Sequence, residues 1–550
     1  MARTAARVLV DCLLAQGVTT AFGVPGESYL AVIDALHDVQ DRIRLVPNRH
    51  EGGAAFMAEA WGKLTGRPGI ALVTRGPGAT NAAIGVHTAM QDSSPMILFV
   101  GQVGRGMRGR EAFQEIDYRA AFGPLAKWAV EIDDPDRVPE LVGRAFAVAQ
   151  SGRPGPVVVA LPEDMLVAPC PAEPGPALRI PQAAPTPDAI GELQTRLAAA
   201  RAPLVLVGGS GWSRGARAGL RAFAEANRLP VVTAWRRTDL IDSASPSFVG
   251  IGGLGKPAYL RALIESADLI LGIGLRFGEV TTDGYEFPSS RQTLIHVHAS
   301  DAELNRIFPA DLPIQAHPNA LIAALDGLQV ASDAWAARTR AARAACLADV
   351  ATPAQPGGLD MGIVVRTLQA VLPQDAILTN GAGNFAIWTN RHFRFTGDQR
   401  LLAPQSGAMG YGLPAAVAAR IARPDATVVC LAGDGDFQMT APELGTAMQA
   451  GAQPIVLVVN NGLYGTIRMH QERRYPGRAS FTALANPDFV QLARAYGFHA
   501  ERVAASADFP AAFARARASA TGALLDLVVS PESLTPQLTL SALAAATQKG

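Results

Sequence analysis

The chain has 550 residues, of which 49% are hydrophobic and 17% are charged, and its formal net charge is zero. A chain this long exceeds what one hydrophobic core can organise, so we expect about three to four domains. The sequence contains no basic stripe, which argues against a nucleic-acid partner and favours a small-molecule partner.

The N-terminal segment has a basic start and an apolar stretch, as a signal peptide has. Asp11 interrupts that stretch, and VTTAFGVPG at 18–26 is typical of a strand followed by a turn. We therefore expect a helix and a strand of a folded domain, in a protein of the cytoplasm. The sequence has no run of about 18 uninterrupted apolar residues, so no membrane span is expected.

Short apolar runs alternate with Ala-rich helical patterns along the whole chain. The runs are IALVT at 70–74, MILFVG at 96–101, VVVAL at 157–161, LVLVG at 204–208, LILGIG at 269–274, LIHVH at 294–298, VVCLAG at 428–433 and IVLVVNN at 455–461. Continuously apolar strands separated by helices predict an α/β fold, with parallel sheets covered by helices on both faces.

Two breaks divide this pattern. Residues 167–189 are rich in proline, and an Ala/Arg helical stretch at 333–350 is followed by ATPAQPGG. We therefore expect three α/β domains at 1–166, 190–330 and 358–530, followed by a short tail. The four cysteines are scattered, which argues against a disulfide framework or a zinc cluster; they are Cys12, Cys170, Cys346 and Cys430.

Two polar turns in the third domain predict a metal site. The apolar run VVCLAG leads directly into Gly433-Asp434-Gly435-Asp436, and after a helical segment the run PIVLVV leads into Asn460-Asn461-Gly462. In a βαβ crossover, Asp434 and Asn461 would both lie at the carboxyl ends of neighbouring parallel strands. A carboxylate, an amide oxygen and a backbone carbonyl suit Mg²⁺ that also binds phosphate oxygens. The alternative is a pair of tight strand-end turns, which this spacing makes the weaker interpretation.

The turns at 433–435 and 460–461 resemble the metal–diphosphate signature of thiamine-diphosphate enzymes. The resemblance continues over nearly the whole chain and is closest to the acetolactate (acetohydroxyacid) synthase-like branch. Its further segments are RHEGGAAFMAE at 49–59, VTRGPGATN at 73–81, AFQEID at 112–117, SGRPGPVVVALPED at 151–164 and QSGAMGYGLPAAVAA at 405–419.

The resemblance implies three doubly wound parallel-sheet domains. These are a pyrimidine-binding domain, a central FAD- or nucleotide-binding-like domain, and a diphosphate- and Mg-binding domain. It also implies active sites between two subunits, hence a homodimer or homotetramer, and it leaves the existence of a regulatory subunit open.

Glu51 is the first catalytic residue that the resemblance implies. It would hydrogen-bond N1′ of the cofactor's aminopyrimidine across the subunit interface, and a carboxyl in an Ala/Gly-lined pocket can share a proton with that nitrogen. The alternative is a solvated glutamate at the start of a helix, which the other motifs disfavour.

The remaining cofactor positions follow the same resemblance. Gly407 and Met409 would contact the pyrimidine and support the bent cofactor, and Asp434, Asn461 and the carbonyl of Leu463 would bind the metal. Positions expected to touch the diphosphate are Gly383, Asn384, Gly435 and Asp436.

Around the substrate, the resemblance implies that Phe113, Gln114 and Lys127 shape and polarise the pocket, with Gln114 as a second catalytic residue. Each also has a plausible structural role. Gly26, in GVPGES, matches the loop that faces the thiazolium ring.

Four positions depart from the acetolactate synthase pattern. His470 stands in place of a tryptophan that favours larger acceptors, and Val280 in place of the acceptor-binding arginine. Glu27 replaces a small residue beside the thiazolium, and Arg75 replaces a serine. Glu27 and Arg75 either pair with each other or meet a different substrate. We count Glu27, Arg75 and His470 as substrate positions together with Gly26, Phe113 and Lys127.

The central domain carries the glycine turn LVLVGGSG, but WRRTDL at 235–240 replaces the small segment that faces flavin in the family. Bound FAD and an empty or nucleotide-occupied domain are the two alternatives. His296 and His298 alternate on one strand without a third ligand nearby in sequence, so we expect a structural role for both.

These features predict thiamine-diphosphate- and Mg²⁺-dependent decarboxylation of a small, pyruvate-like 2-oxo acid, followed by carboligation. One alternative is a decarboxylase, oxidase or carbon–carbon hydrolase acting on a different 2-oxo acid or diketone. A second alternative is a non-catalytic paralogue that only binds the cofactor.

Overall fold

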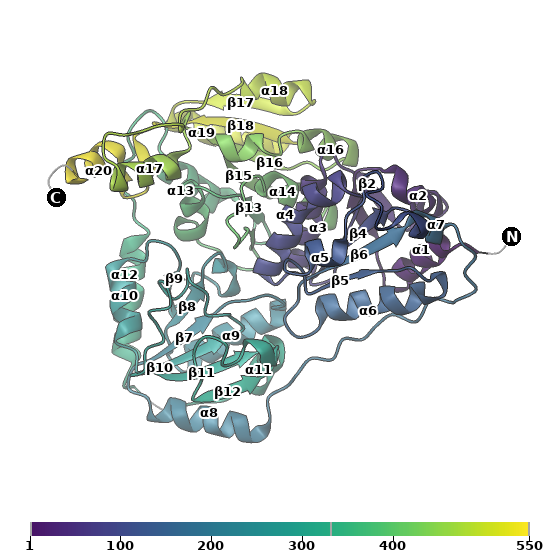
Figure 1. Ribbon diagram of the computed structural model, residues 1–550. Coiled ribbons are helices and arrows are strands. Elements are labelled where there is room, and N and C mark those ends of the chain that lie inside the picture. Colours follow the sequence, from purple (N-terminus) through teal and green to yellow (C-terminus); the bar gives the residue numbers. More distant parts are fainter. Residues whose placement is uncertain (1–2, 331–332, 548–550) are drawn as a thin grey trace.

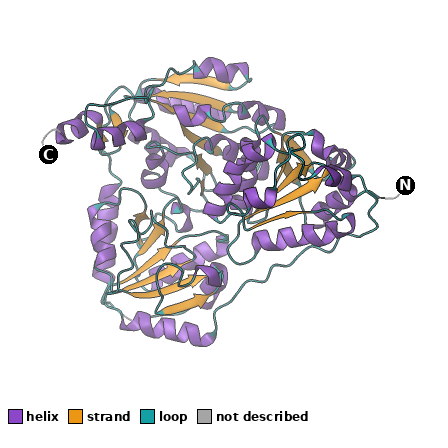
Figure 2. Ribbon diagram, viewed as in Figure 1, coloured by secondary structure: helices purple, strands orange, loops and turns teal. Residues whose placement is uncertain are grey.

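The computed structural model describes residues 3–330 and 333–547. Figure 1 and Figure 2 show three α/β units, each built around one sheet with helices on both sides. Each sheet has six strands, all parallel. The predicted fold class, three doubly wound parallel sheets, is therefore confirmed.

The first unit, at the right of Figure 1, has the strand order β2-β1-β3-β4-β6-β5. Its strands are β1 (Thr20–Gly23), β2 (Arg44–Pro47), β3 (Gly69–Val73), β4 (Met96–Gln102), β5 (Trp128–Glu131) and β6 (Pro156–Pro162). Its helices are α1 (Ala5–Ala15), α2 (Leu30–His37), α3 (Glu51–Thr65), α4 (Pro77–Asp92), α5 (Tyr118–Phe122), α6 (Val138–Gln150) and α7 (Glu163–Leu166). The N-terminal segment is the predicted helix and strand, α1 and β1.

The third unit, at the top of Figure 1, has the order β14-β13-β15-β16-β18-β17. Its strands are β13 (Ile377–Asn380), β14 (Arg400–Leu402), β15 (Val428–Gly433), β16 (Ile455–Asn460), β17 (His499–Val503) and β18 (Ala523–Val528). Its helices are α13 (Met361–Val371), α14 (Gly412–Ala422), α15 (Asp434–Gln438), α16 (Glu443–Ala450), α17 (Gly465–Arg474), α18 (Phe489–Ala495) and α19 (Phe509–Ala518). Numbered within each unit, the first and third sheets share the order 2-1-3-4-6-5, which supports a common origin.

The central unit has the order β12-β11-β10-β7-β8-β9, the arrangement of dinucleotide-binding folds. Its strands are β7 (Pro203–Val207), β8 (Val231–Ala234), β9 (Phe248–Gly252), β10 (Leu269–Ile273), β11 (Thr293–His298) and β12 (Leu312–Gln315). Its helices are α8 (Pro187–Ala199), α9 (Arg214–Ala226), α10 (Ala258–Glu265), α11 (Pro318–Ala324) and α12 (Ala336–Asp349).

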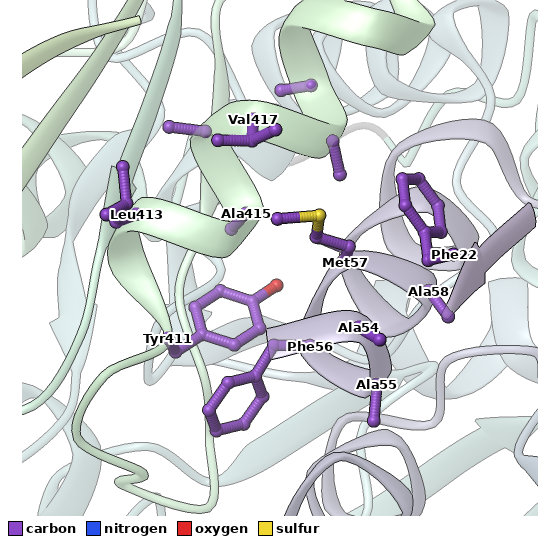
Figure 3. Close-up of a cluster of buried hydrophobic side chains, with 14 of the residues drawn as sticks. Phe22, Ala54, Ala55, Phe56, Met57, Ala58, Tyr411, Leu413, Ala415 and Val417 are labelled. Carbon is purple, nitrogen blue, oxygen red and sulfur yellow. The ribbon is translucent and has the colours of Figure 1, made fainter. Parts of the chain in front are cut away.

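The first and third units share one hydrophobic core, in which α3 packs on α14. In Figure 3 the side chain of Met57 lies between the two helices, opposite Ala415 and Val417. Helix α3 begins after His50, whose side chain accepts a hydrogen bond from the Gly52 N–H. It ends at Gly66, which has the left-handed conformation. This packing fixes the position of Glu51, the first residue of α3.

A buried ionic network that includes Lys63 of α3 joins all three units. The Lys63 ammonium lies 3.1 Å from both the Glu59 and the Asp92 carboxylates. Tyr411, of the third unit, donates a hydrogen bond to Glu59 at 2.5 Å. Arg237, of the central unit, donates to the backbone oxygen of Asp92 at 2.8 Å. Removing one partner of such a network leaves a buried charge, at a cost of about 3–5 kcal/mol.

The C-terminal tail is folded rather than a short extension. A two-stranded hairpin, β19 (Ser533–Thr535) and β20 (Leu538–Thr539), leads into α20 (Leu540–Thr547). Leu534 and Leu543 bury against Met469 of α17. No helix among residues 3–330 and 333–547 is long and apolar enough to cross a membrane.

Candidate active site

The carboxyl ends of β13, β15 and β16 enclose a cavity of about 250 Å³. In a sheet of this order, successive strands are added on opposite sides of the β13–β15 pair, and open α/β sheets bind ligands at such a switch point. Apart from Glu51, the predicted cofactor and metal positions all line this cavity: Gly383, Asn384, Gly407, Met409, Asp434, Gly435, Asp436, Asn461 and Leu463. The structure thus brings together residues that lie up to 80 positions apart.

Asp434 is the buried carboxylate of this cavity, 3% exposed. One oxygen accepts from the backbone N–H of Gly435 at 3.0 Å, and the other from the Gly462 N–H and the Asn486 amide, both at 2.8 Å. Burial raises the pKa of Asp434, and these donors oppose the shift. A carboxylate held in this way is a ready ligand for a cation that would offset its desolvation.

Asn461 and Leu463 lie on the next turn along the sheet edge. The Asn461 side-chain oxygen accepts from the Leu463 N–H at 3.1 Å, and Gly462 between them has φ +68°. No group of three or more His, Cys, Asp or Glu side chains gathers as a metal site among the described residues. A metal at Asp434 therefore needs oxygen ligands of other kinds, such as an amide, a carbonyl and the phosphate oxygens of a bound molecule.

Asp436 is the second buried carboxyl of the lining. One oxygen accepts from the Ala382 and Gly410 N–H groups at 3.1 and 2.8 Å, whereas the other has no hydrogen-bond partner within the described part of the chain. Burial raises the pKa of Asp436 to about 7. A Cβ at Gly381 would lie 2.0 Å from this carboxyl, so the position requires glycine.

The turn that carries Gly407 and Met409 closes the cavity opposite the metal turns. Gly407 has φ +69°, and its N–H donates to the Pro404 carbonyl at 3.0 Å. Asn384 is held by Thr466, whose hydroxyl donates to the Asn384 side-chain oxygen at 3.0 Å and accepts from its N–H at 2.9 Å. These contacts fix the backbone on both sides of the space.

A second cluster of predicted residues lies at the carboxyl ends of the strands of the first sheet. Gly26 packs against Thr74, and a Cβ there would clash at 2.5 Å. Gln114 has φ +65° and lies against Gly76. Glu51 accepts a hydrogen bond from the Asn81 amide at 2.9 Å. Among the described residues of one chain, Glu51 is not part of the lining of the 250 Å³ cavity.

The alternative in which Glu27 pairs with Arg75 is wrong. The Arg75 guanidinium lies 2.8 Å from Glu163, at the end of β6, and 5.9 Å from the ring centre of Phe113. Glu27 is exposed, and Phe113 is 74% exposed. Glu27 and Phe113 are thus both accessible on the surface of one chain.

The structure argues against a substrate role for Lys127. Its ammonium donates to the backbone oxygens of Val148 and Ser151, at the C-terminal end of α6, and burial lowers its pKa to about 8. Lys127 precedes β5 and lies at the amino edge of the sheet, beside Pro156. A seven-residue strand places this edge about 20 Å from the carboxyl edge, where Arg75 lies.

His296 and His298 make structural contacts, as their alternation in sequence predicts. His296 bonds to the Leu275 carbonyl at 3.0 Å and packs edge-on against Phe277. His298 accepts from the Ser300 N–H at 3.0 Å, and burial lowers its pKa to about 4.

Family models match all three units of the chain. The C-terminal TPP-binding domain of thiamine pyrophosphate enzymes matches residues 381–527, the N-terminal TPP-binding domain residues 3–121, and the central domain residues 190–325. The chain is 32% identical to the acetolactate synthase isozyme 2 large subunit of Escherichia coli (strain K12), with 90% of each chain covered. It is 30% identical to the probable acetolactate synthase large subunit of Methanocaldococcus jannaschii, with 97% of this chain and 93% of the relative covered.

The chain belongs to the acetolactate synthase-like family of thiamine pyrophosphate enzymes. It is therefore a thiamine-diphosphate-dependent enzyme of the acetolactate synthase kind. The cavity at the third sheet fits this cofactor, because its buried carboxylate and backbone turns suit a metal-bound diphosphate.

Two cavities border the glycine turn of the central unit, where the family resemblance left a flavin or a nucleotide open. The glycine turn after β7 abuts the turn after β10, since a Cβ at Gly209 would lie 1.9 Å from the Gly274 oxygen. The cavity that both turns line, at the switch point of that sheet, is about 20 Å³, whereas ligand sites occupy about 300–1,000 Å³. A larger cavity of about 630 Å³, lined by Gly209 and Gly211 as well as Arg237, lies on the side of the first unit.

Several residues of the site carry no sequence signal that identifies them. Asn486, which holds Asp434, and Ser533 and Leu534, which line the cavity, lie outside every motif. Thr466 is the exception, because its position four residues before His470 on a helix places it on the same face.

Proposed function

We propose that the protein uses thiamine diphosphate and Mg²⁺ to decarboxylate a small, pyruvate-like 2-oxo acid and to join the product to an acceptor, as acetolactate synthases do. One observation carries the proposal. Asp434, Asn461 and Leu463 meet on adjacent strand ends in one cavity with the Gly407–Met409 turn. The names of the relatives support the acetolactate synthase reaction.

In this proposal Asp434, the Asn461 amide oxygen and the Leu463 carbonyl bind Mg²⁺, while the backbone near Gly383 and Gly435 contacts the diphosphate. The donors from Gly462 and Asn486 already orient the Asp434 carboxylate. Such outer contacts typically change metal affinity about 10–100-fold when removed. The bound cofactor would supply the electron sink for carbon–carbon cleavage.

Glu51 would act from a second copy of the chain. It lies outside the cavity of its own chain, at the carboxyl edge of the first sheet, where Asn81 holds its side chain. A homodimer or homotetramer that places this edge against the 250 Å³ cavity would bring the carboxyl to N1′ of the pyrimidine. There it would hold the proton that the ring nitrogen requires.

The residues beside Glu51 would form the substrate side of the same site. Gln114, held by its backbone against Gly76, would offer an amide to the substrate, and Phe113 an apolar wall. Glu27 makes no ion pair with any residue in the ranges 3–330 and 333–547, whereas Arg75 is engaged by Glu163. The expected cytoplasmic location stays a prediction.

The test is release of CO₂ from a panel of 2-oxo acids by the full-length protein with thiamine diphosphate. Release should require Mg²⁺ and should stop when a chelator is added. Absence of CO₂ from every acid, in protein shown to bind the cofactor, would sink the proposal.

A second candidate function keeps the cofactor but changes the outcome: a decarboxylase, oxidase or carbon–carbon hydrolase. It is motivated by His470, which lines a second chamber next to the cofactor cavity, and by Val280, whose side chain offers no charge for an acceptor. Assays of acetolactate, acetoin and peroxide from pyruvate separate these outcomes.

A further inference from the structure

A second chamber, of about 490 Å³, lies between the central and third units. It shares five lining residues with the cofactor cavity, so the two spaces are contiguous: Ala382, Gly383, Asn384, Gly407 and Thr466. Whatever occupies the chamber therefore lies next to the proposed cofactor site.

The Trp235–Arg237 segment borders both the chamber and the 630 Å³ cavity at the glycine turn. Trp235 and Arg236 line the chamber, whereas the next residue, Arg237, lines the 630 Å³ cavity on the other side. Arg236 is buried and donates to the Pro404 carbonyl, and Arg237 donates to the Asp92 carbonyl at 2.8 Å. This segment therefore lies between the chamber and the cavity at the glycine turn.

The lining of the chamber is strongly cationic. One carboxylate, that of Asp349, lines the chamber together with six basic side chains: Arg236, Lys256, Arg343, Arg391, Arg394 and Arg473. Arg391 is bound to Asp349 at 2.7 Å, and Lys256 to Asp283 at 2.6 Å. The other four have no carboxylate partner within the described ranges 3–330 and 333–547.

Two of these four guanidinium groups are free to bind a ligand. Arg236 and Arg343 donate to backbone carbonyls of the chain. The side chains of Arg394 and Arg473 make no hydrogen bond or ion pair with any residue that the structure describes. A guanidinium favours a bidentate contact with a carboxylate.

Helix α17 leads from the cofactor cavity to Arg473. Thr466 lines both spaces, and His470 and Arg473 follow it on the same helical face, at spacings of four and seven residues. At 1.5 Å per residue, the backbone of Arg473 lies about 10 Å beyond that of Thr466. An anionic group bound there would belong to a molecule longer than pyruvate.

We propose that the chamber binds the far end of a 2-oxo acid that carries a second carboxylate, which Arg394 and Arg473 hold while the oxo-acid end lies in the cofactor cavity. This inference rests on the proposed function, of which it names the substrate class.

The experiment measures the affinities of the full-length protein, with thiamine diphosphate and Mg²⁺, for 2-oxoglutarate and for pyruvate. Binding is followed by calorimetry under conditions without turnover, or by Trp fluorescence at times too short for turnover. The Arg394→Gln and Arg473→Gln variants should each weaken 2-oxoglutarate about tenfold or more and change pyruvate less than about twofold. The matched control is Arg474→Gln, the neighbouring arginine, which is exposed like Arg473 but does not line the chamber and should leave both affinities unchanged.

Equal weakening of both acids, or no weakening of 2-oxoglutarate, would overturn the inference. Its failure is distinguishable from that of the proposed function. If the protein releases CO₂ from pyruvate but neither variant affects 2-oxoglutarate binding, only the proposed role of the chamber is refuted. If 2-oxoglutarate binding depends on the two arginines but no acid releases CO₂, the proposed reaction is refuted and the binding site stands.

Discussion

The Asp434 carboxylate accepts a hydrogen bond from the backbone N–H of Gly462 at 2.8 Å, which ties the carboxyl end of β15 to that of β16. The side chain of Asn486 donates to the same oxygen, also at 2.8 Å. The proposed metal ligand is thus oriented by the turn that carries the other two proposed ligands.

Replacing Asp434 should remove metal-dependent cofactor binding, whereas replacing its support should only weaken it. We expect Asp434→Ala to lower the affinity for Mg²⁺ and thiamine diphosphate by at least about 100-fold, and Asn486→Ala by about tenfold. Titration of cofactor binding at fixed Mg²⁺ measures both. Equal affinities for wild type and Asp434→Ala would contradict the metal assignment.

Asp436 should make the cofactor-free protein less stable as the pH rises. Because burial raises its pKa to about 7 in the folded state, the folded chain holds this proton when the unfolded chain has already released it. The contribution of protonated Asp436 to the free energy of unfolding is complete below about pH 4 and is lost as the pH rises toward 7. About 2 kcal/mol of it is lost between pH 5 and pH 7. Urea unfolding of wild type and Asp436→Asn at both pH values checks this. An identical pH dependence of the two proteins would refute it.

Lys127 should matter for folding and not for the substrate. Its ammonium binds the carbonyl groups at the end of α6, so Lys127→Met should lower the free energy of unfolding by about 1–3 kcal/mol. The KM for the 2-oxo acid should change less than about twofold. A raised KM in a variant of unchanged stability would restore the substrate role predicted from the sequence.

The purified enzyme should carry no flavin. The Trp235–Arg237 segment separates the chamber from the glycine turn, so we expect no visible flavin absorbance and no shift of Tm on addition of FAD. The same measurements on Arg236→Gly show whether the guanidinium itself closes the path. A yellow wild-type protein that releases stoichiometric FAD on denaturation would contradict this prediction.

The sequence carries most of the fold, because continuously apolar strands such as 428–433 identify buried parallel sheets without further information. It also places Asp434 and Asn461 together, since strand ends in a βαβ unit meet at one edge. The pairing of Arg75 with Glu163, and the contact of Lys127 with Ser151 at the opposite edge, depend on strand order across 88 and 24 positions respectively, which no local pattern encodes.

The positions of Arg236 and Arg237 also could not be predicted from the sequence. WRRTDL is visible as a departure in sequence, but whether its charges face solvent, a ligand or another unit depends on the packing of three domains. The buried contacts with Pro404 and Asp92 decide this. The folded tail is likewise invisible locally, because Leu534 contacts Met469 only in the assembled unit.

The central claim is that Glu51 of one copy serves the Asp434 cavity of another, and mixing two inactive variants tests it most directly. Glu51→Gln and Asp434→Asn should each be nearly inactive as pure proteins. Co-assembled in equal amounts, half of the dimers are mixed, and each mixed dimer holds one site with both native residues, so about a quarter of wild-type activity should return. No recovery in dimers shown to be mixed would contradict the account.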